Sequence, residues 1–235
     1  MPYYLRWTKE EIKTLETNFT RLGPTSQTEP VTRQTLLDLL PTKSWGAIKW
    51  KANQLNLERD FKLAYPPLNL SRFDTGYIAG LTDGEGCISI SKNKRKNRET
   101  NLHPYISIAN TDLDVLNWIT ELTTLGSVRR LTPTPVSERT EKWHQRPWIW
   151  SKCYTWQTSS YGGCYRFLTD IGPYLKIKKR LAELVLEFLE IQHTKSKPRV
   201  EIDPQTGYFI KRITAERISR EEDIYQEVKK LNHRP

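Results

Sequence analysis

The spacing of hydrophobic residues switches repeatedly along this chain between a helical period and the alternating period of strands. At the N-terminal end, apolar residues recur at helical spacing and predict three short helices, over about 8–22, 32–40 and 44–55. A capping box formed by Thr8 and Glu11 marks the start of the first helix. We expect these helices to form a small all-α domain over residues 1–60.

The middle of the chain alternates between helical and strand periods. Residues 61–71 contain two adjacent prolines and little periodicity, which is typical of a linker. From 72 to 193 the pattern predicts a helix, two strands, a helix, two strands and a long helix. The strands are indicated at 87–91, 104–110, 127–132 and 152–159. This order predicts an α+β domain with one sheet and its helices on one face.

The last part of the chain, residues 194–235, reads as an extension of that domain. A hairpin is predicted over 198–213, and Ser219 with Glu222 indicates the start of a final helix. The apolar residues of this helix are Ile224, Val228 and Leu231. The pattern leaves open whether the helix packs on the core or contacts a ligand.

Composition points to a polyanionic partner. The formal net charge is +10, and nucleic acid is favoured over an acidic protein at this length. No apolar run approaches the length of a membrane span or of a signal-peptide core, so we expect a cytoplasmic protein of a bacterial or phage-type genome, with an organelle as the alternative. Three cysteines without Cys-x-x-Cys spacing argue against a disulfide framework and a zinc site.

The most informative stretch lies at the start of the middle region. Gly76, Gly80 and Gly84 recur every four residues and therefore share one helix face. Each costs about 1 kcal/mol against alanine, which close approach of a second helix would offset. The helix ends at Glu85, where a carboxylate meets the negative end of the helix dipole. A divalent cation there would make this favourable; an ordinary buried helix with a solvated turn is the alternative.

Two segments carry a family resemblance. The run Ile-Ala-Gly-Leu-Thr-Asp-Gly-Glu-Gly, residues 78–86, resembles the signature helix of the LAGLIDADG homing endonucleases. The run Pro-Tyr-Leu-Lys-Ile-Lys, residues 173–178, is similar to a segment that opens a long helix in that family. The resemblance implies an αββαββα fold whose polar strand faces form a DNA-reading saddle. It also implies a site-specific DNA endonuclease that uses Mg²⁺, for which Mn²⁺ can substitute.

The resemblance also implies roles for particular residues. Glu85 and the carbonyl of Gly84 would hold the metal, and Lys178 would stabilise transition-state charge or orient solvent. Asn110 falls where relatives place a water-ordering amide, commonly the longer Gln. A basic residue that some relatives carry would fall at Asp114, which has the wrong sign, and Arg129 or Arg130 would substitute.

Only one signature motif is present, so the second catalytic acid is expected from a second copy. We therefore expect a homodimer on a near-palindromic site. Its interface is expected along the signature helix, at Gly76, Ala79, Gly80 and Asp83. Asp83 is interpreted as a structural residue.

DNA contacts are expected along the polar strand faces and at the tip of the first hairpin. The expected residues are Cys87, Ser89, Ser91, Asn93, Lys94, Arg95, Lys96, Arg98, Tyr105, Ser107, Arg129, Arg130, Thr155 and Gln157. For the basic run after Asn93, a solvated loop is the alternative. A long polar loop over Pro133–Trp148 has no assigned role.

The N-terminal helices resemble a single Myb/SANT-like helix-turn-helix unit. The resemblance rests on Arg-Trp-Thr-Lys-Glu-Glu from Arg6 and Ser-Trp-Gly-Ala-Ile-Lys from Ser44, although the tryptophan of the second helix is missing. The third helix would then enter a major groove. Its expected contacts are Lys43, Lys49, Lys51, Asn53 and Gln54. A three-helix protein-interaction module is the alternative.

The rival function is a non-cleaving DNA- or RNA-binding relative, such as an intron maturase, which would bind intron RNA, or a transcription factor. Retention of both Glu85 and Lys178 favours the enzyme, since a binder needs neither. A structural interaction protein would not explain a basic chain with four polar strand faces.

Overall fold

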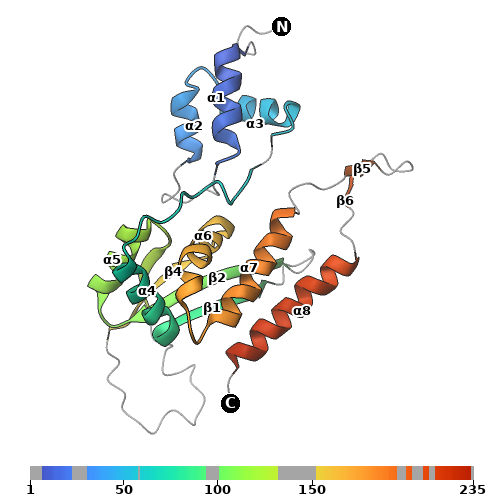
Figure 1. Ribbon diagram of the computed structural model, residues 1–235. Helices are drawn as coiled ribbons and strands as arrows, with labels where there is room; N and C mark the ends of the chain where they lie inside the picture. Colours follow the sequence, from blue (N-terminus) through green and yellow to red (C-terminus); the bar gives the residue numbers. More distant parts are fainter. Residues whose placement is uncertain are drawn as a thin grey trace, which may run out of the picture.

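The structure is a computed structural model in which two bodies are joined by an extended segment (Figure 1). It describes residues 7–22, 31–57, 59–93, 101–131, 152–194, 200–202, 209–211 and 215–233. Several sequence predictions lie outside these residues. They are the contacts expected at Lys94, Arg95, Lys96 and Arg98, the loop Pro133–Trp148 and the turn of the C-terminal hairpin.

The first body consists of the three predicted helices, α1 (Lys9–Phe19), α2 (Arg33–Leu39) and α3 (Trp45–Gln54). The predicted capping box at the start of α1 is present, with the Thr8 hydroxyl accepting from the Glu11 N–H at 3.1 Å. The helices enclose a core of their own. Its buried residues are Leu15, Phe19, Leu22, Val31, Leu36, Leu40, Ile48 and Ala52.

The second body, called the sheet body below, contains the predicted order of helices and strands. Its elements are α4 (Arg72–Glu85), β1 (Gly86–Asn93), β2 (Asn101–Asn110), α5 (Leu113–Thr123), β3 (Ser127–Arg130), β4 (Tyr154–Thr158), α6 (Tyr161–Ile171), the 3₁₀ turn η4 (Gly172–Tyr174) and α7 (Lys179–Thr194). The strands pair antiparallel in the order β1-β2-β4-β3. The helices lie on one face of this sheet, as predicted (Figure 1).

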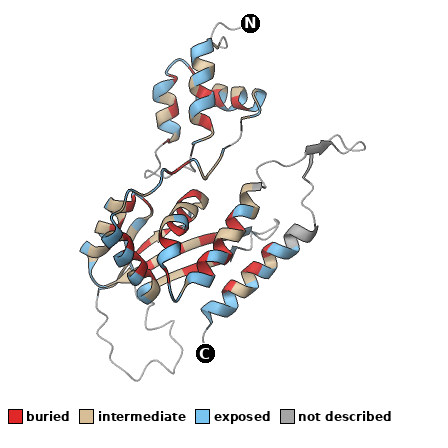
Figure 2. Cartoon of the chain, viewed as in Figure 1, coloured by how far each residue is buried: buried red, intermediate tan, exposed pale blue. Residues whose placement is uncertain are grey.

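Strand alternation sorts the sheet into an apolar face and a polar face. Ile88 and Ile106 face each other in register and are fully buried, and Ile108 pairs in the same way with buried Trp156. The Trp156 indole donates to the Leu125 carbonyl at 2.9 Å, which satisfies the only polar atom of this side chain. Figure 2 shows buried residues on the strands of this sheet and on the helices beside them. Among the described residues, no helix covers the opposite face of the strands (Figure 1).

The segment expected to be a linker packs along the sheet body. Ala64 and Tyr65 are buried in its core, and the Leu68 N–H donates to Asp170 at 2.7 Å. A Cβ added at Gly162 would lie 2.6 Å from the Phe61 carbonyl, so glycine is required for this close approach. The segment therefore has an irregular backbone but buries some of its side chains. Since no helix or strand sets the spacing of those side chains, the sequence shows no hydrophobic period here.

Charged groups at the start of this segment connect the two bodies. The Asp60 N–H donates to the Thr20 carbonyl at the end of α1, at 2.7 Å. The Asp60 carboxylate lies 2.9 Å from Nε2 of His193, near the end of α7, and Lys62 pairs with Glu190 on the same helix. The N-terminal helices are thus held near the C-terminal end of α7.

The C-terminal extension contains the predicted hairpin, β5 (Val200–Ile202) and β6 (Phe209–Lys211), and a final helix α8 (Ala215–Asn232). The helix begins before Ser219, so the predicted start at Ser219 is wrong. Ile224 and Val228 join the core of the sheet body, whereas Leu231 is 37% exposed and does not. The helix packs on α7 and β1.

None of the helices in the described ranges is long and apolar enough to cross a membrane.

Candidate active site and nucleic-acid face

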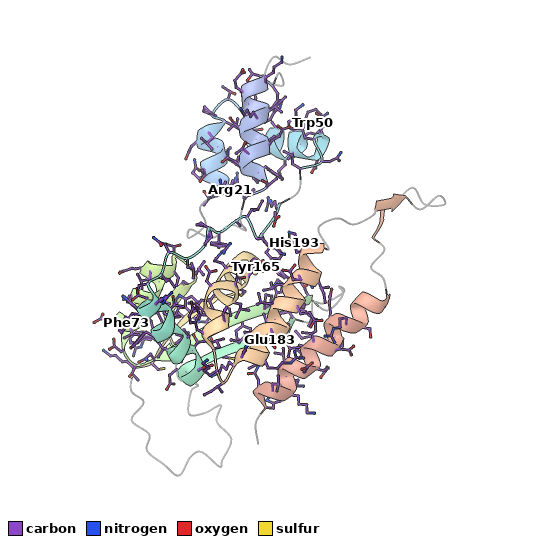
Figure 3. All side chains as sticks on the ribbon, in the orientation of Figure 1. Arg21, Trp50, Phe73, Tyr165, Glu183 and His193 are labelled. Carbon is purple, nitrogen blue, oxygen red and sulfur yellow. The ribbon has the colours of Figure 1, made fainter. Side chains whose placement is uncertain are left out.

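Helix α4 has one buried face and one face without side chains. Ile78 is buried on the first, while Gly76, Gly80 and Gly84 lie exposed on the second. A Cβ added at any of the three glycines would meet no atom within 4 Å. Phe73 stands beside this stripe and is 77% exposed (Figure 3). We call this surface the bare face of α4; it leaves room for another backbone to approach.

Ala79 does not belong to the bare face, so its predicted place at a dimer interface is wrong. Its side chain is 2% exposed and packs in the core of its own chain. At 100° per residue, Ala79 lies about 60° around the helix from Gly76, on the side that meets the sheet. The three glycines are spaced by four residues, so each is rotated by about 40° from the one before, in the direction away from Ala79. They therefore stay on the exposed side of the helix.

Asp83 ties the end of α4 to the turn that precedes α7. Its carboxylate accepts from the backbone N–H groups of Lys176 (2.7 Å), Ile177 (3.2 Å) and Lys178 (2.9 Å). Burial alone would raise the pKa of Asp83, but these donors and the Lys178 charge hold it below its usual value. The structural role predicted for Asp83 is supported by these bonds. Its expected place at a dimer interface stays a prediction, with the carboxylate already engaged within its own chain.

Lys178 is brought to the same helix end. Its ammonium group donates to the main-chain carbonyl of Asp83, one peptide before Gly84 and Glu85. A cation at a helix C-terminus is stabilised by the dipole, so the contact fixes this charge at the end of α4, two residues before Glu85 in the chain. Lys178 is half-buried, whereas Glu85 is exposed. Two residues from distant motifs thus meet at one end of α4.

The oxygen donors at this end suit a hard cation but do not complete a site within one chain. The Gly86 N–H, bonded to the Thr82 carbonyl, closes the helical hydrogen bonds of α4, and the Gly84 carbonyl lies beyond it. This carbonyl and the Glu85 carboxylate are the oxygen types that Mg²⁺ prefers. In the part of the chain that the structure describes, no three His, Cys, Asp or Glu residues cluster as a metal site. A second chain or a substrate would have to add donors.

Asn110 ends strand β2 close to this helix end. Ile108 pairs with Gly86, so Asn110 lies two residues further along toward the end of α4. Its amide oxygen accepts from the Asp112 N–H at 2.9 Å, which leaves the amide nitrogen as the group able to order a water. Asp114 is exposed on α5, so no basic group occupies that position.

The two candidate arginines on β3 are separated by strand alternation. Arg129 lies on the polar face, where its guanidinium donates to the Gln157 side-chain oxygen at 2.7 Å. Arg130 shares the side of Val128, which packs against the core. Arg130 therefore does not lie on the expected DNA face, and this prediction is wrong.

The polar strand face forms an open groove of about 1150 Å³. Of the predicted contacts, those lining it are Ser91, Asn93, Tyr105, Ser107, Arg129, Thr155 and Gln157. Cys87 and Ser89 share this strand face but not the groove lining, with the Cys87 sulfur 3.9 Å from the Tyr105 hydroxyl. Thr155 lies at the floor of the groove, because it is only 5% exposed and its hydroxyl donates to the Trp156 carbonyl. The prediction that Thr155 contacts DNA directly is therefore wrong.

The groove residues that the sequence patterns missed include three with polar rings, His103, Tyr161 and Tyr65. His103 lies on β2 in phase with Tyr105, but the predicted strand began after it. Tyr161, at the start of α6, and Tyr65, from the expected linker, close one end of the groove. Longer alternation would have found His103, whereas the two tyrosines come from segments without a strand period.

In the N-terminal helices, the prediction for Lys43 is wrong. Lys43 is 8% exposed, pairs with Glu11 at 3.0 Å and lies over the Trp7 ring at 5.3 Å. It precedes the first turn of α3 and holds this helix to α1.

The outward face of α3 retains the other predicted polar residues. Lys49, Asn53 and Gln54 are exposed and Lys51 is half-buried. The sequence patterns missed Trp50, which is 51% exposed beside Lys49 (Figure 3). An exposed tryptophan next to polar and basic groups marks this face as a candidate contact surface.

Comparison with known proteins agrees with this geometry. Residues 78–142 match the family model described as LAGLIDADG endonuclease. This match lies within the sheet body and supports the family resemblance that the signature run predicted. Among curated protein sequences, none matches this chain significantly.

Solved structures of similar fold come from homing endonucleases. The archaeal intron-encoded I-Vdi141I, complexed with DNA, has a TM-score of 0.50 and 16% identity over 69% of this chain and 86% of its own. I-CvuI in complex with a DNA target has a TM-score of 0.49 and 15% identity over 70% of this chain and 85% of its own. The likeness to I-Vdi141I shows the same fold.

Proposed function

We propose that this chain is a divalent-metal-dependent, site-specific DNA endonuclease that acts as a homodimer on a long, near-palindromic site. The observation that carries the proposal is the meeting of Lys178 with the C-terminal end of α4, directly before Gly84 and Glu85. A protein that only binds DNA has no need to hold a cation against the end of the helix that presents its carboxylate.

Phosphodiester hydrolysis requires a nucleophilic water, neutralisation of phosphate charge and help for the leaving oxygen. A bound Mg²⁺, or Mn²⁺ in its place, would supply charge neutralisation and lower the pKa of a bound water. Glu85 and the Gly84 carbonyl would hold the ion. Lys178 would stabilise negative charge developing on the phosphate, and the amide nitrogen of Asn110 would orient the attacking water.

The homodimer is supported by the bare face of α4 and by the single carboxylate at its end. Each chain offers one Glu85 at this site, whereas cutting two strands requires two acids. The glycines of the bare face would let two α4 helices pack backbone to backbone, and Phe73 would flank the contact. A two-fold axis between them would place equivalent grooves on two half-sites, which explains the near-palindromic target.

DNA recognition would use two separate surfaces. The groove offers polar strand side chains, including the Arg129–Gln157 pair, which is suited to base edges. The outward face of α3, with Lys49, Trp50 and Asn53, would lengthen the contact as a helix-turn-helix unit. Because the segment through Asp60 anchors α1–α3 to α7, the second surface would act at high effective concentration.

A non-cleaving relative that binds DNA, or intron RNA as a maturase, is the second candidate. One observation favours it: Asp114 stands exposed on α5 where relatives carry a basic residue, which would weaken catalysis.

Cleavage of a randomised duplex library by the purified protein with Mg²⁺ separates the two functions. We expect cuts with short 3′ overhangs at one long sequence, abolished in Glu85→Gln. Glu121→Gln, an exposed glutamate on α5, is the matched control and should cut normally. Sequence-specific binding without cutting in either Mg²⁺ or Mn²⁺ would establish the binder instead.

A further inference from the structure

We infer that the basic C-terminal end of α8, through Lys229 and Lys230, binds DNA phosphates next to the cut position. This inference rests on the proposed function and adds a contact that the family match, residues 78–142, does not include. It follows from where α8 ends, from how its charges are distributed and from what lies beside it.

Helix α8 runs antiparallel to β1, with its C-terminal end at the start of that strand. Near its N-terminal half, Glu222 pairs with Lys92 at 2.8 Å, one residue before the end of β1. At its other end, the Asn232 side chain donates to the Ile88 carbonyl at 3.0 Å. Ile88 is three residues after Glu85, or about 10 Å along an extended strand. The last turn of α8 therefore lies close to the candidate active site.

The start of α7 lies beside the same end of α8. Arg180 binds Glu227 through two nitrogens, at 2.8 and 3.0 Å. The turn before α7 is in turn bound to Asp83 at the end of α4. The ends of α4 and α8 and the start of α7 thus converge, and Lys178 belongs to this corner of the molecule.

The charges of α8 are segregated along its length. Glu222 and Glu227 form ion pairs with Lys92 of β1 and Arg180 of α7. Lys229 and Lys230 are exposed, and neither makes an ion pair among the described residues. These two ion pairs tie α8 to β1 and α7, while the C-terminal end of the helix keeps the positive charges of Lys229 and Lys230. Phosphates are the anions that this charge would meet if DNA occupies the neighbouring site.

The test measures the salt dependence of duplex binding. The probe is a fluorescein-labelled random-sequence duplex of about 40 base pairs, titrated without divalent metal from about 50 to 300 mM KCl. For Lys229→Gln with Lys230→Gln, the slope of log K against log salt should fall by about 1.8, because two phosphate contacts are lost. Binding near 0.1 M salt should weaken by about tenfold or more.

Two matched variants isolate the charge at this position. Lys9→Gln with Lys13→Gln removes two exposed charges from α1 and should leave the slope unchanged. Lys229→Arg with Lys230→Arg should retain the wild-type slope. If the glutamines lower the melting temperature, Lys229→Ala with Lys230→Ala replaces them, because alanine favours the helix.

The outcomes separate this inference from the proposed function. A protein that binds the duplex with an unchanged slope in the α8 variant would overturn the inference and leave the endonuclease intact. An equal fall of the salt slope in the α1 control would also overturn the inference, because the loss of any two positive charges would then have the same effect. Failure of the wild-type protein to bind any duplex would overturn both.

Discussion

The N-terminal helices and the sheet body use their lysines in opposite ways. In the first body, Lys43 is buried against Glu11 and Trp7 and joins two helices. In the second, Lys178 is fixed by the main-chain carbonyl of Asp83, and its charge remains at the end of α4, the helix that ends at the exposed Glu85. Both lysines stand in basic segments that suggested a function, but only one is placed where a ligand could use it.

Core size explains the difference. Among the described residues, the N-terminal core contains eight buried side chains, whereas that of the sheet body contains 26. A small core buries too little apolar surface to hold its helices alone, so polar groups also stabilise it. The sheet body is stable on one face of its sheet and can leave the other face polar for a ligand. A basic residue near a small core is therefore weaker support for function than one at the edge of a large core.

The contrast between the two bodies predicts that they unfold separately. Trp156→Ala should destabilise the sheet body by about 3–5 kcal/mol, since it empties a fully buried site. Ile48→Ala should destabilise the N-terminal helices by about 2–5 kcal/mol. Calorimetry should show two transitions, each lowered by its own variant. A single transition moved by both would mean that the anchored segment unites the bodies.

Replacing each of the two lysines by methionine separates a role in cleavage from a role in stability. Lys178→Met should slow cleavage at saturating DNA by about 10²–10³-fold, because a preorganised cation at the phosphate is lost. Lys43→Met should leave this rate unchanged and lower the stability of the N-terminal helices by about 1–3 kcal/mol. Single-turnover cleavage and urea unfolding measure the two effects. Slower cleavage in Lys43→Met would assign a functional role to both bodies.

Acid should weaken the sheet body through Asp83. Because the folded-state pKa of Asp83 is lowered, its ionised form contributes stability above the unfolded pKa, about 3.9. That contribution is lost as the pH falls toward the folded pKa. Asp83→Asn should therefore be less stable than wild type at pH 7, with the difference shrinking below about pH 4. Urea unfolding at several pH values measures it, and a difference independent of pH would contradict the assignment.

The smallest effect is expected on α4 itself. Gly80→Ala should raise the stability of the monomer by about 1 kcal/mol, because helix propensity improves and the added Cβ meets no atom. Ala79→Gly, one residue away on the buried face, should lower it by a similar amount. Sedimentation should also show a weaker dimer for Gly80→Ala alone. An unchanged dimer would remove the bare face as the interface.

Much of the fold could be predicted because its patterns are local. Alternation along β1 and β2 assigned Ser89 and Tyr105 to a polar face without knowledge of any neighbour, since successive strand residues point to opposite faces. The signature run and the segment ending at Lys178 indicated the family. Their meeting at the end of α4 needed only the order of elements that the family shares.

The sequence by itself determined the elements, the polar strand face and the two motifs of the site. Only the tertiary structure decided that Lys43 is buried, that Ala79 faces its own core, that Arg130 lies away from the groove and that α8 ends near the candidate active site. The physical reason is distance along the chain. Strand and helix periods express interactions between residues a few positions apart, whereas a residue such as Asn232 acquires its role from Ile88, 144 positions earlier.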